Sequence, residues 1–339
     1  MCGRYVLAIA VVNSIASLAC CSSFVLVPRP QIYSPLYRQT RYISSLKMAV
    51  TEDATAWAGP TLGPEETLAG MVDAVRQAGD AALTLQTADL SRKTKQGHHD
   101  IVTEGDIASQ RIAMEGLAKV LPGLQFAAEE ADDDALVPGV PLAPIDPDGL
   151  IGADSYLALD PVDGTTNFAC GGPDWGVAAA VVNQKQGPTH GVLYLPRKGI
   201  LVEAAKGHGC RVNGEVVRLR EGQRIKECLV AAEIGAFIPD DRLQRLLALV
   251  HHSMGIRNLF SSTGNTADII SGVHGAWVHL KGGSVWDFAA GALAVQEAGG
   301  FVCDLQGQPL RWDNLKMEVI LAANKNIAQE IVEVLDVRK

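Results

Sequence analysis

Several short patterns that mark large classes of protein are missing from this sequence. Its seven cysteines show no CxxC spacing and its eight histidines show no HxxxH or HExxH pattern, so neither a disulfide framework nor a zinc site is indicated. No GxGxxG or P-loop pattern is present, which excludes the common dinucleotide and nucleoside-triphosphate motifs. Aromatic residues make up only 5% of the chain, but 47% of its 339 residues are apolar, which is enough for a large globular core.

Positive charge is scarce outside the first 50 residues. Those residues contain five basic side chains and no acidic one, which leaves 24 basic (29 less 5) against 38 acidic residues in the rest, a balance of −14. Because phosphate backbones are bound by basic surfaces, we expect no nucleic-acid partner. An acidic body is compatible with a site for divalent cations.

Residues 1–60 are interpreted as a targeting leader rather than as part of the fold. Residues 5–27 are mostly apolar and follow Arg4, which suits a signal peptide or a transmembrane helix. Residues 28–48 are rich in Arg, Ser, Pro and Tyr and contain no acid, which is typical of a transit peptide. The two parts together predict import into a plastid or another organelle, with the leader removed or disordered. Secretion, a membrane anchor and a cytoplasmic product starting at Met48 are the alternatives.

Residues 61–339 are expected to form one functional domain. Apolar periodicity and helix-start residues predict helices at 63–86, 106–120, about 240–251, 265–272, 286–298 and 327–335. Strand-like runs lie between them, separated by turn signals such as the Asn-Gly at 213–214. Strands interleaved with helices indicate an α/β (α+β layered) architecture.

Acidic residues stand at four points where a predicted strand ends or a predicted helix begins. They are Asp106, the pair Glu129 and Glu130, the pair Asp160 and Asp163, and Asp287. Each has an ordinary structural explanation, because helix N-termini favour aspartate, Asp-Pro is common in turns, and acidic pairs often lie on solvated edges. The similar letters IDPDG at 145–149 show that such a pattern is weak by itself.

The setting of Asp160 and Asp163 in LALDPVDGTTNF favours a functional role. The pair follows a short apolar strand, and ligands bind at the carboxyl ends of strands in α/β sheets. Two carboxylates this close repel each other unless a positive charge lies between them, and oxygen ligands suit Mg²⁺. Gly164 and the following N–H groups, at a helix start, suit an anion. Adjacent cation and anion sites predict phosphoryl chemistry.

Three motifs in order then resemble one family. DPVDGTTNF, with AAEE about thirty residues before it and WDFAAGALAVQEAGG about 120 after it, is similar to the inositol monophosphatase family of Mg²⁺-dependent, lithium-sensitive phosphatases. The similarity runs from about residue 64 to 337. It implies an alternating α-β-α-β-α sandwich and a homodimer that acts on a small phosphorylated metabolite.

The resemblance also implies roles for individual residues. Two to three Mg²⁺ ions would be held by five positions: Glu129, Asp160, the carbonyl of Val162, Asp163 and Asp287. Catalysis would depend on Glu129, which with Thr165, held by Asp106, orients and deprotonates the attacking water. Phosphate would be bound by Gly164, Thr165, Thr166 and Lys95.

The sequence departs from the family at the position that contacts sugar hydroxyls. Family members that cleave inositol phosphates have a glutamate seven residues before the WD aspartate, and here that residue is Leu280, followed by Lys281. Inositol or sugar phosphates remain the first expectation. Histidinol phosphate and 3′(2′),5′-bisphosphate nucleotides are alternatives, although Thr166 replaces the lysine typical of the nucleotidase branch. A catalytically silent metal-binding regulatory protein is the non-enzyme alternative. We interpret Trp286 as core, and Cys170 has no histidine partner that would make it a nucleophile.

Overall fold

A computed structural model describes residues 59–336 apart from 87–91, 95–100 and 236–237. Residues 1–58 of the predicted leader and Lys95 lie outside the described residues, so both predictions stay open. Among the residues that are described, no helix is long and apolar enough to cross a membrane.

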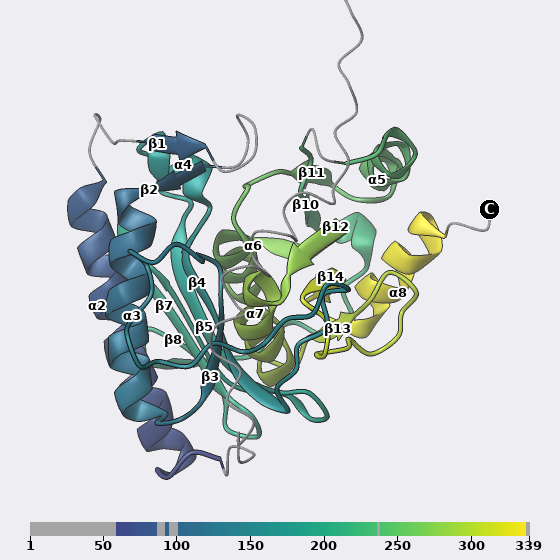
Figure 1. The fold of residues 1–339 in the computed structure, drawn as a ribbon. Helices are drawn as coiled ribbons and strands as arrows, with labels where there is room; N and C mark the ends of the chain where they lie inside the picture. The colour runs from purple at the N-terminus through teal and green to yellow at the C-terminus, as the bar shows by residue number, and fades with distance from the viewer. Residues whose placement is uncertain (1–58, 87–91, 95–100, 236–237, 337–339) are drawn as a thin grey trace, which may run out of the picture.

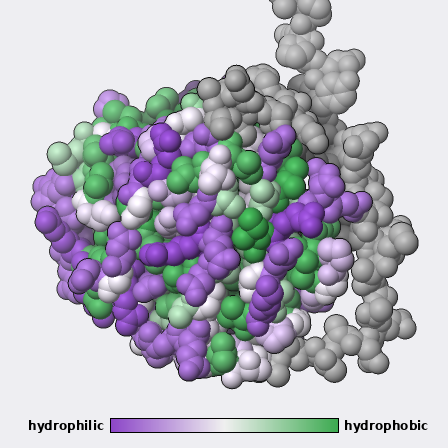
Figure 2. Space-filling model, turned by 90° about the vertical axis from the view of Figure 1, so that its left-hand side faces the viewer, coloured by the Kyte–Doolittle hydropathy of each residue, from purple (hydrophilic) through white to green (hydrophobic). Residues whose placement is uncertain are grey.

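Two long helices form the first layer (Figure 1). Helix α2 (Pro64–Leu85) starts with a proline and two glutamates, which suit the orphan N–H groups and the dipole of a helix N-terminus. It packs along α3 (Glu104–Val120), and both helices lie on one face of the large sheet. The outer face of this layer carries hydrophilic and hydrophobic residues side by side, with no single apolar patch dominating the view (Figure 2).

The second layer is a seven-stranded sheet whose strands follow chain order. They are β3 (Gln125–Ala128), β4 (Ser155–Asp163), β5 (Gly176–Asn183), β6 (Gly187–Leu195), β7 (Ile200–Ala205), β8 (Gly209–Val212) and β9 (Glu215–Val217). Only the β3–β4 pair is parallel. Strand β4 is buried on both faces, which explains its continuous apolar run.

Helices α6 (Ser262–Ile270) and α7 (Val285–Glu297) form the middle layer between the two sheets. The five-stranded sheet has the order β11 (Gly255–Arg257), β10 (Leu229–Ala232), β12 (His274–Ser284), β14 (Lys316–Ala322), β13 (Phe301–Cys303). Successive residues of β12 face opposite sides of this sheet. Trp277 packs on the α7 side, whereas Ala276 and Val278 pack against the outer helices. Helix α7 is apolar nearly all round because both sheets cover it.

The last layer contains α5 (Asp240–His252) and α8 (Lys325–Leu335). Smaller elements are the β1 (Arg92–Thr94) and β2 (Ile101–Thr103) ribbon, α4 (Thr165–Ala169), and two 3₁₀ turns, η1 (Pro196–Lys198) and η2 (Ile225–Glu227). The α-β-α-β-α sandwich expected from the sequence is therefore confirmed. Helix α6 begins earlier than predicted, because Ser261 caps it at a point where the sequence offered no clear periodicity.

Candidate active site

The carboxyl ends of β3 and β4 bring Glu129 and Asp160 together. The two strands are parallel neighbours with Ala128 opposite Leu159, and the Glu129 N–H donates to the Leu159 carbonyl over 3.2 Å. Glu129 follows Ala128 and Asp160 follows Leu159, so both acids lie at the same edge of the sheet. Their side chains are close enough for Glu129 to raise the pKa of Asp160. Parallel pairing thus unites two acids that are 31 positions apart in the sequence.

Asp287 reaches the same place from the N-terminus of α7. Its carboxylate accepts from the Ser284 N–H over 2.6 Å, so it caps the helix as well as facing the site. Lys316 lies opposite Ser284 in the β12–β14 register and donates from Nζ to Ser284 Oγ over 2.7 Å. An ammonium group therefore stands beside this carboxylate.

Burial and mutual repulsion govern the titration of the cluster. The pKa of Asp160 is raised well above its usual range, first by burial and then by the charges of Glu129, Asp163 and Asp287. Burial also raises the pKa of Asp287 to about 7, against the opposing effect of Lys316. Carboxylates that repel each other in a buried site call for a cation to compensate them.

Asp106 connects the second helix to the DGTT turn. It is fully buried, and one carboxylate oxygen accepts from the Thr103 N–H over 2.8 Å in a capping box. Thr165 Oγ1 lies 3.2 Å from the other oxygen and 3.1 Å from the Val162 carbonyl. The structural explanation of Asp106 as a helix-cap residue is therefore correct, and the same side chain also contacts Thr165.

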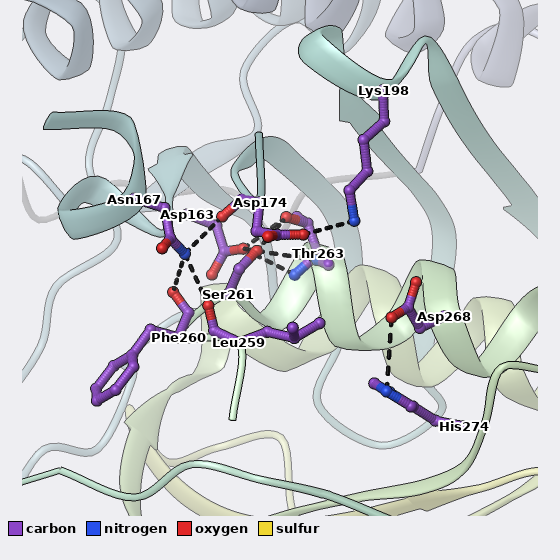
Figure 3. A network of polar contacts seen from close by, with 11 residues as sticks. Asp163, Asn167, Asp174, Lys198, Leu259, Phe260, Ser261, Thr263, Asp268 and His274 are labelled. Carbon is purple, nitrogen blue, oxygen red and sulfur yellow. Dashed lines mark hydrogen bonds and ion pairs between the residues drawn. The ribbon is translucent and has the colours of Figure 1, made fainter. Parts of the chain in front are cut away.

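Gly164 shapes the turn that follows Asp163. Its φ of +82° is left-handed, and a Cβ added there would lie 2.8 Å from the Asp174 carbonyl oxygen. The Asn167 amide donates to that same carbonyl over 2.8 Å and to the Leu259 carbonyl over 2.7 Å (Figure 3). The turn is thus held tightly against the loop between β11 and α6.

Asp163 points toward the start of α6. It accepts from the N–H and the hydroxyl of Ser262, from the N–H and the hydroxyl of Thr263, and from the Ser261 hydroxyl. Figure 3 shows this carboxylate with Ser261 and Thr263, beside the Asn167 contacts. The pKa of Asp163 is raised by burial, while these hydrogen bonds act in the opposite direction.

The donor set fits a hard divalent cation. Oxygen ligands such as carboxylates and backbone carbonyls are the ones that Mg²⁺ prefers. Glu129 and Asp287 are half-buried and interact electrostatically with the buried Asp160. In the part of the chain that the structure describes, no three His, Cys, Asp or Glu side chains converge as ligands around one point. The hydrogen bonds explain this, because Asp163 turns to α6 and Asp287 turns to the Ser284 N–H.

The remaining predicted residues differ in their surroundings. Glu130 is 3% exposed and its backbone pairs with the Gln110 amide, so the solvated-edge explanation of the acidic pair is wrong. Thr166 is exposed at the start of α4. Leu280 packs its side chain into the apolar cluster under α5 and α8 rather than facing the acids. Cys170 is exposed and carries a free thiol.

Two groups of contacts at the site were not anticipated from the sequence. Lys316 opens a strand and belongs to no motif, so nothing in the sequence singles it out. The run Ser261–Ser262–Thr263 reads locally as a helix N-cap, and that signal was available. Only the tertiary structure shows that this N-cap also binds Asp163, which lies 98 positions earlier.

Known proteins share this arrangement of layers and motifs. A profile of the inositol monophosphatase family matches residues 64–337. Inositol monophosphatase 1 of Bos taurus is 26% identical over 272 residues, which cover 77% of this chain and 91% of that protein. Fructose-1,6-bisphosphatase/inositol-1-monophosphatase of Thermotoga maritima is 28% identical over 242 residues, 71% of this chain and 85% of that protein.

A solved structure agrees with these sequence relatives. The extragenic suppressor protein suhB from Bartonella henselae superposes with a TM-score of 0.67 at 26% identity, covering 80% of this chain and 98% of that one. The match includes nearly the whole of that structure, so the two proteins share the layered fold.

Proposed function

The chain belongs to the inositol monophosphatase family, and we propose that it hydrolyses a small phosphomonoester, an inositol monophosphate or a sugar phosphate, with Mg²⁺ bound in the acidic site. Its relatives are named as phosphatases, and it is a phosphatase of this superfamily. The observation that carries the finer proposal is the cluster of the buried Asp160 with the half-buried Glu129 and Asp287, beside the Gly164 turn.

The ions would be held by five ligands: Glu129, Asp160, the Val162 carbonyl, Asp163 and Asp287. When bound, Mg²⁺ supplies a positive charge that lowers the pKa of water and compensates charge on the phosphate oxygens. The two to three ions expected from the resemblance remain part of this proposal.

The protein's own groups orient the attacking water. Thr165 Oγ1 has a single proton and two acceptors within reach, Asp106 and the Val162 carbonyl. Its proton is therefore engaged, and its free lone pair accepts a hydrogen bond from the water. Glu129 then takes the proton of that water at a carboxylate oxygen. No covalent enzyme intermediate is required.

The phosphate contacts are assigned to the turn. The first N–H groups of a helix have no partner within it, so those of Gly164, Thr165 and Thr166 are the candidate donors. Lys95 lies outside the described residues and keeps its predicted role as a further contact.

The position of Leu280 bears on which substrate the site accepts. The buried side chain of Leu280 cannot accept a hydrogen bond from a substrate hydroxyl, which supports sugar phosphates as well as inositol phosphates as substrates. The relative from Thermotoga maritima carries both activities in its name, which supports the same breadth. Homodimer formation and import into a plastid or another organelle are further proposals, supported by the family resemblance and by the composition of residues 1–60.

The test is phosphate release from a panel of esters with and without Mg²⁺. The panel contains myo-inositol 1-phosphate, fructose 1,6-bisphosphate, galactose 1-phosphate, histidinol phosphate and adenosine 3′,5′-bisphosphate. Asp160→Asn removes a charge from the acidic site, whereas Asp148→Asn changes an exposed aspartate in the look-alike IDPDG turn. We expect Mg²⁺-dependent release that Asp160→Asn abolishes and Asp148→Asn leaves intact. Release that is unaffected by Asp160→Asn would contradict the proposal.

A further inference from the structure

Asp163 faces more hydrogen-bond donors than a carboxylate has lone-pair positions to accept them. Ser262 donates its N–H over 2.8 Å and its hydroxyl over 2.6 Å to Oδ1. Oδ2 faces the Ser261 hydroxyl at 2.6 Å, the Thr263 N–H at 2.8 Å and the Thr263 hydroxyl at 2.5 Å. A carboxylate has about four lone-pair positions. The α6 N-terminus therefore saturates this side chain, which is only 7% exposed.

This saturation bears on the proposed Mg²⁺ site, on which the inference rests. A ligand of a cation needs a lone pair directed at the ion, and Oδ2 already faces three donors. Asp163 can bind an ion only if one donor leaves. By contrast, Asp287 accepts from the Ser284 N–H in the α7 cap, through a single carboxylate oxygen. Exchange of a donor for an ion is thus required at Asp163.

The donors differ in their freedom to leave. The two N–H groups belong to the first turn of α6 and move only with the helix. The Ser261 hydroxyl is held as the N-cap, because it also accepts from the Gly264 N–H over 2.9 Å. The Thr263 hydroxyl lies 3.0 Å from Ser261 Oγ and can rotate its proton to that oxygen instead. It therefore has an alternative acceptor within hydrogen-bond distance.

We propose that the Thr263 hydroxyl is an exchangeable donor that occupies Asp163 Oδ2 in the empty site and gives way when a divalent cation binds. The hydroxyl keeps the buried carboxylate satisfied while no ion is present. It also competes with the ion, so it sets how much Mg²⁺ the enzyme requires. Four other donors still orient Asp163 when this one turns away.

Thr263→Val tests the exchange, because valine keeps the branching of this fully buried side chain and replaces the hydroxyl with a methyl group that cannot donate. Hydrogen bonds to charged groups predict a loss of about 5 °C in the melting temperature in EDTA. The same loss of competition predicts Mg²⁺ binding that is about tenfold tighter by isothermal calorimetry. Thr263→Ser restores a hydroxyl and should match the wild type in both measurements. Thr263→Ala is a second hydroxyl-free variant in case valine prevents folding.

Exchange predicts a lower melting temperature together with a higher Mg²⁺ affinity, and this combination distinguishes it from a merely structural contact. A structural contact would lower the melting temperature and leave Mg²⁺ affinity unchanged or weaker, and either result for both hydroxyl-free variants overturns the inference. If the wild-type chain binds Mg²⁺ and valine leaves that affinity unchanged, the exchange alone is wrong. If the wild-type chain binds no Mg²⁺, the proposed function fails and the exchange fails with it.

Discussion

Replacing Gly164 with alanine should damage catalysis far more than the same replacement at Gly171. Both glycines have left-handed backbones, with φ of +82° and +73°, and they stand seven residues apart around α4. A Cβ at Gly164 would lie 2.8 Å from the Asp174 carbonyl oxygen and 3.2 Å from that of Phe260, whereas a Cβ at Gly171 meets nothing within 4 Å. Comparing the two alanine variants therefore separates the effect of steric crowding from that of backbone strain.

The magnitudes follow from these two terms. A left-handed backbone costs an L-residue about 1–2 kcal/mol, and this applies to both variants. The contact with the Asp174 carbonyl forces the turn to shift, which adds about 1–3 kcal/mol at Gly164 alone. Because the shifted turn carries Thr165 and Thr166, kcat should fall about 100-fold. Gly171→Ala should lose stability by the strain term only and keep kcat near the wild-type value.

Urea unfolding and steady-state phosphate release measure the two effects on the same samples. The ester should be whichever member of the panel is cleaved fastest. Equal losses of stability and of kcat in the two variants would refute the reasoning, because the crowding around Gly164 would then have no consequence. A fall in kcat at Gly171 as large as that at Gly164 would show that strain, not position, governs the turn.

Further outcomes follow from the acidic site and its surroundings. In EDTA, the folded-state pKa of Asp287 near 7 is above its unfolded value, so its contribution to stability is present below about pH 4 and is lost as the pH rises toward 7. The urea midpoint attributable to Asp287 should fall over that range, and a slope unchanged in Asp287→Asn would contradict this. Leu280→Glu should not create inositol-phosphate specificity, because the side chain enters the apolar cluster under α8. It should instead lower the free energy of unfolding by ~3 kcal/mol or more, which urea titration checks. Asn167→Ala should lower kcat while leaving far-UV circular dichroism unchanged, since its amide bridges the carbonyls of Asp174 and Leu259; a kcat equal to that of the wild type would count against this bridge.

Much of the fold was predictable because its signals are local. The helix over 63–86 has a proline start and one apolar face, and α2 occupies 64–85. Glu129 and Asp160 could be placed at the ends of two predicted strands, although only the structure shows that β3 and β4 are parallel neighbours. The capping function of Asp106 was equally readable, because it depends on residues three positions away.

The parts that escaped prediction depend on irregular or distant pairing. The β12–β14 register shifts between His279 and Gly283, so counting back from Asp287 does not reveal which way Leu280 faces. Lys316 reaches the site through that same pairing and has no neighbour in sequence that marks it. The partner of the Ser261–Thr263 cap is set by the docking of α6 against the β4 turn, which no local pattern encodes.

The distribution of the acids along the chain has a consequence for the order of folding. Glu129 and Asp160 are neighbours across the first sheet, but Asp287 arrives on a helix that is buried only when the second sheet packs over it. Contacts of such sequence separation form late, after the entropy of closing the intervening loop has been lost. A nascent chain that has reached residue 230 can contain the first two acids but no complete cation site. With the proposed Mg²⁺ site, the ion would therefore stabilise the finished domain by mass action and would not template its early folding steps.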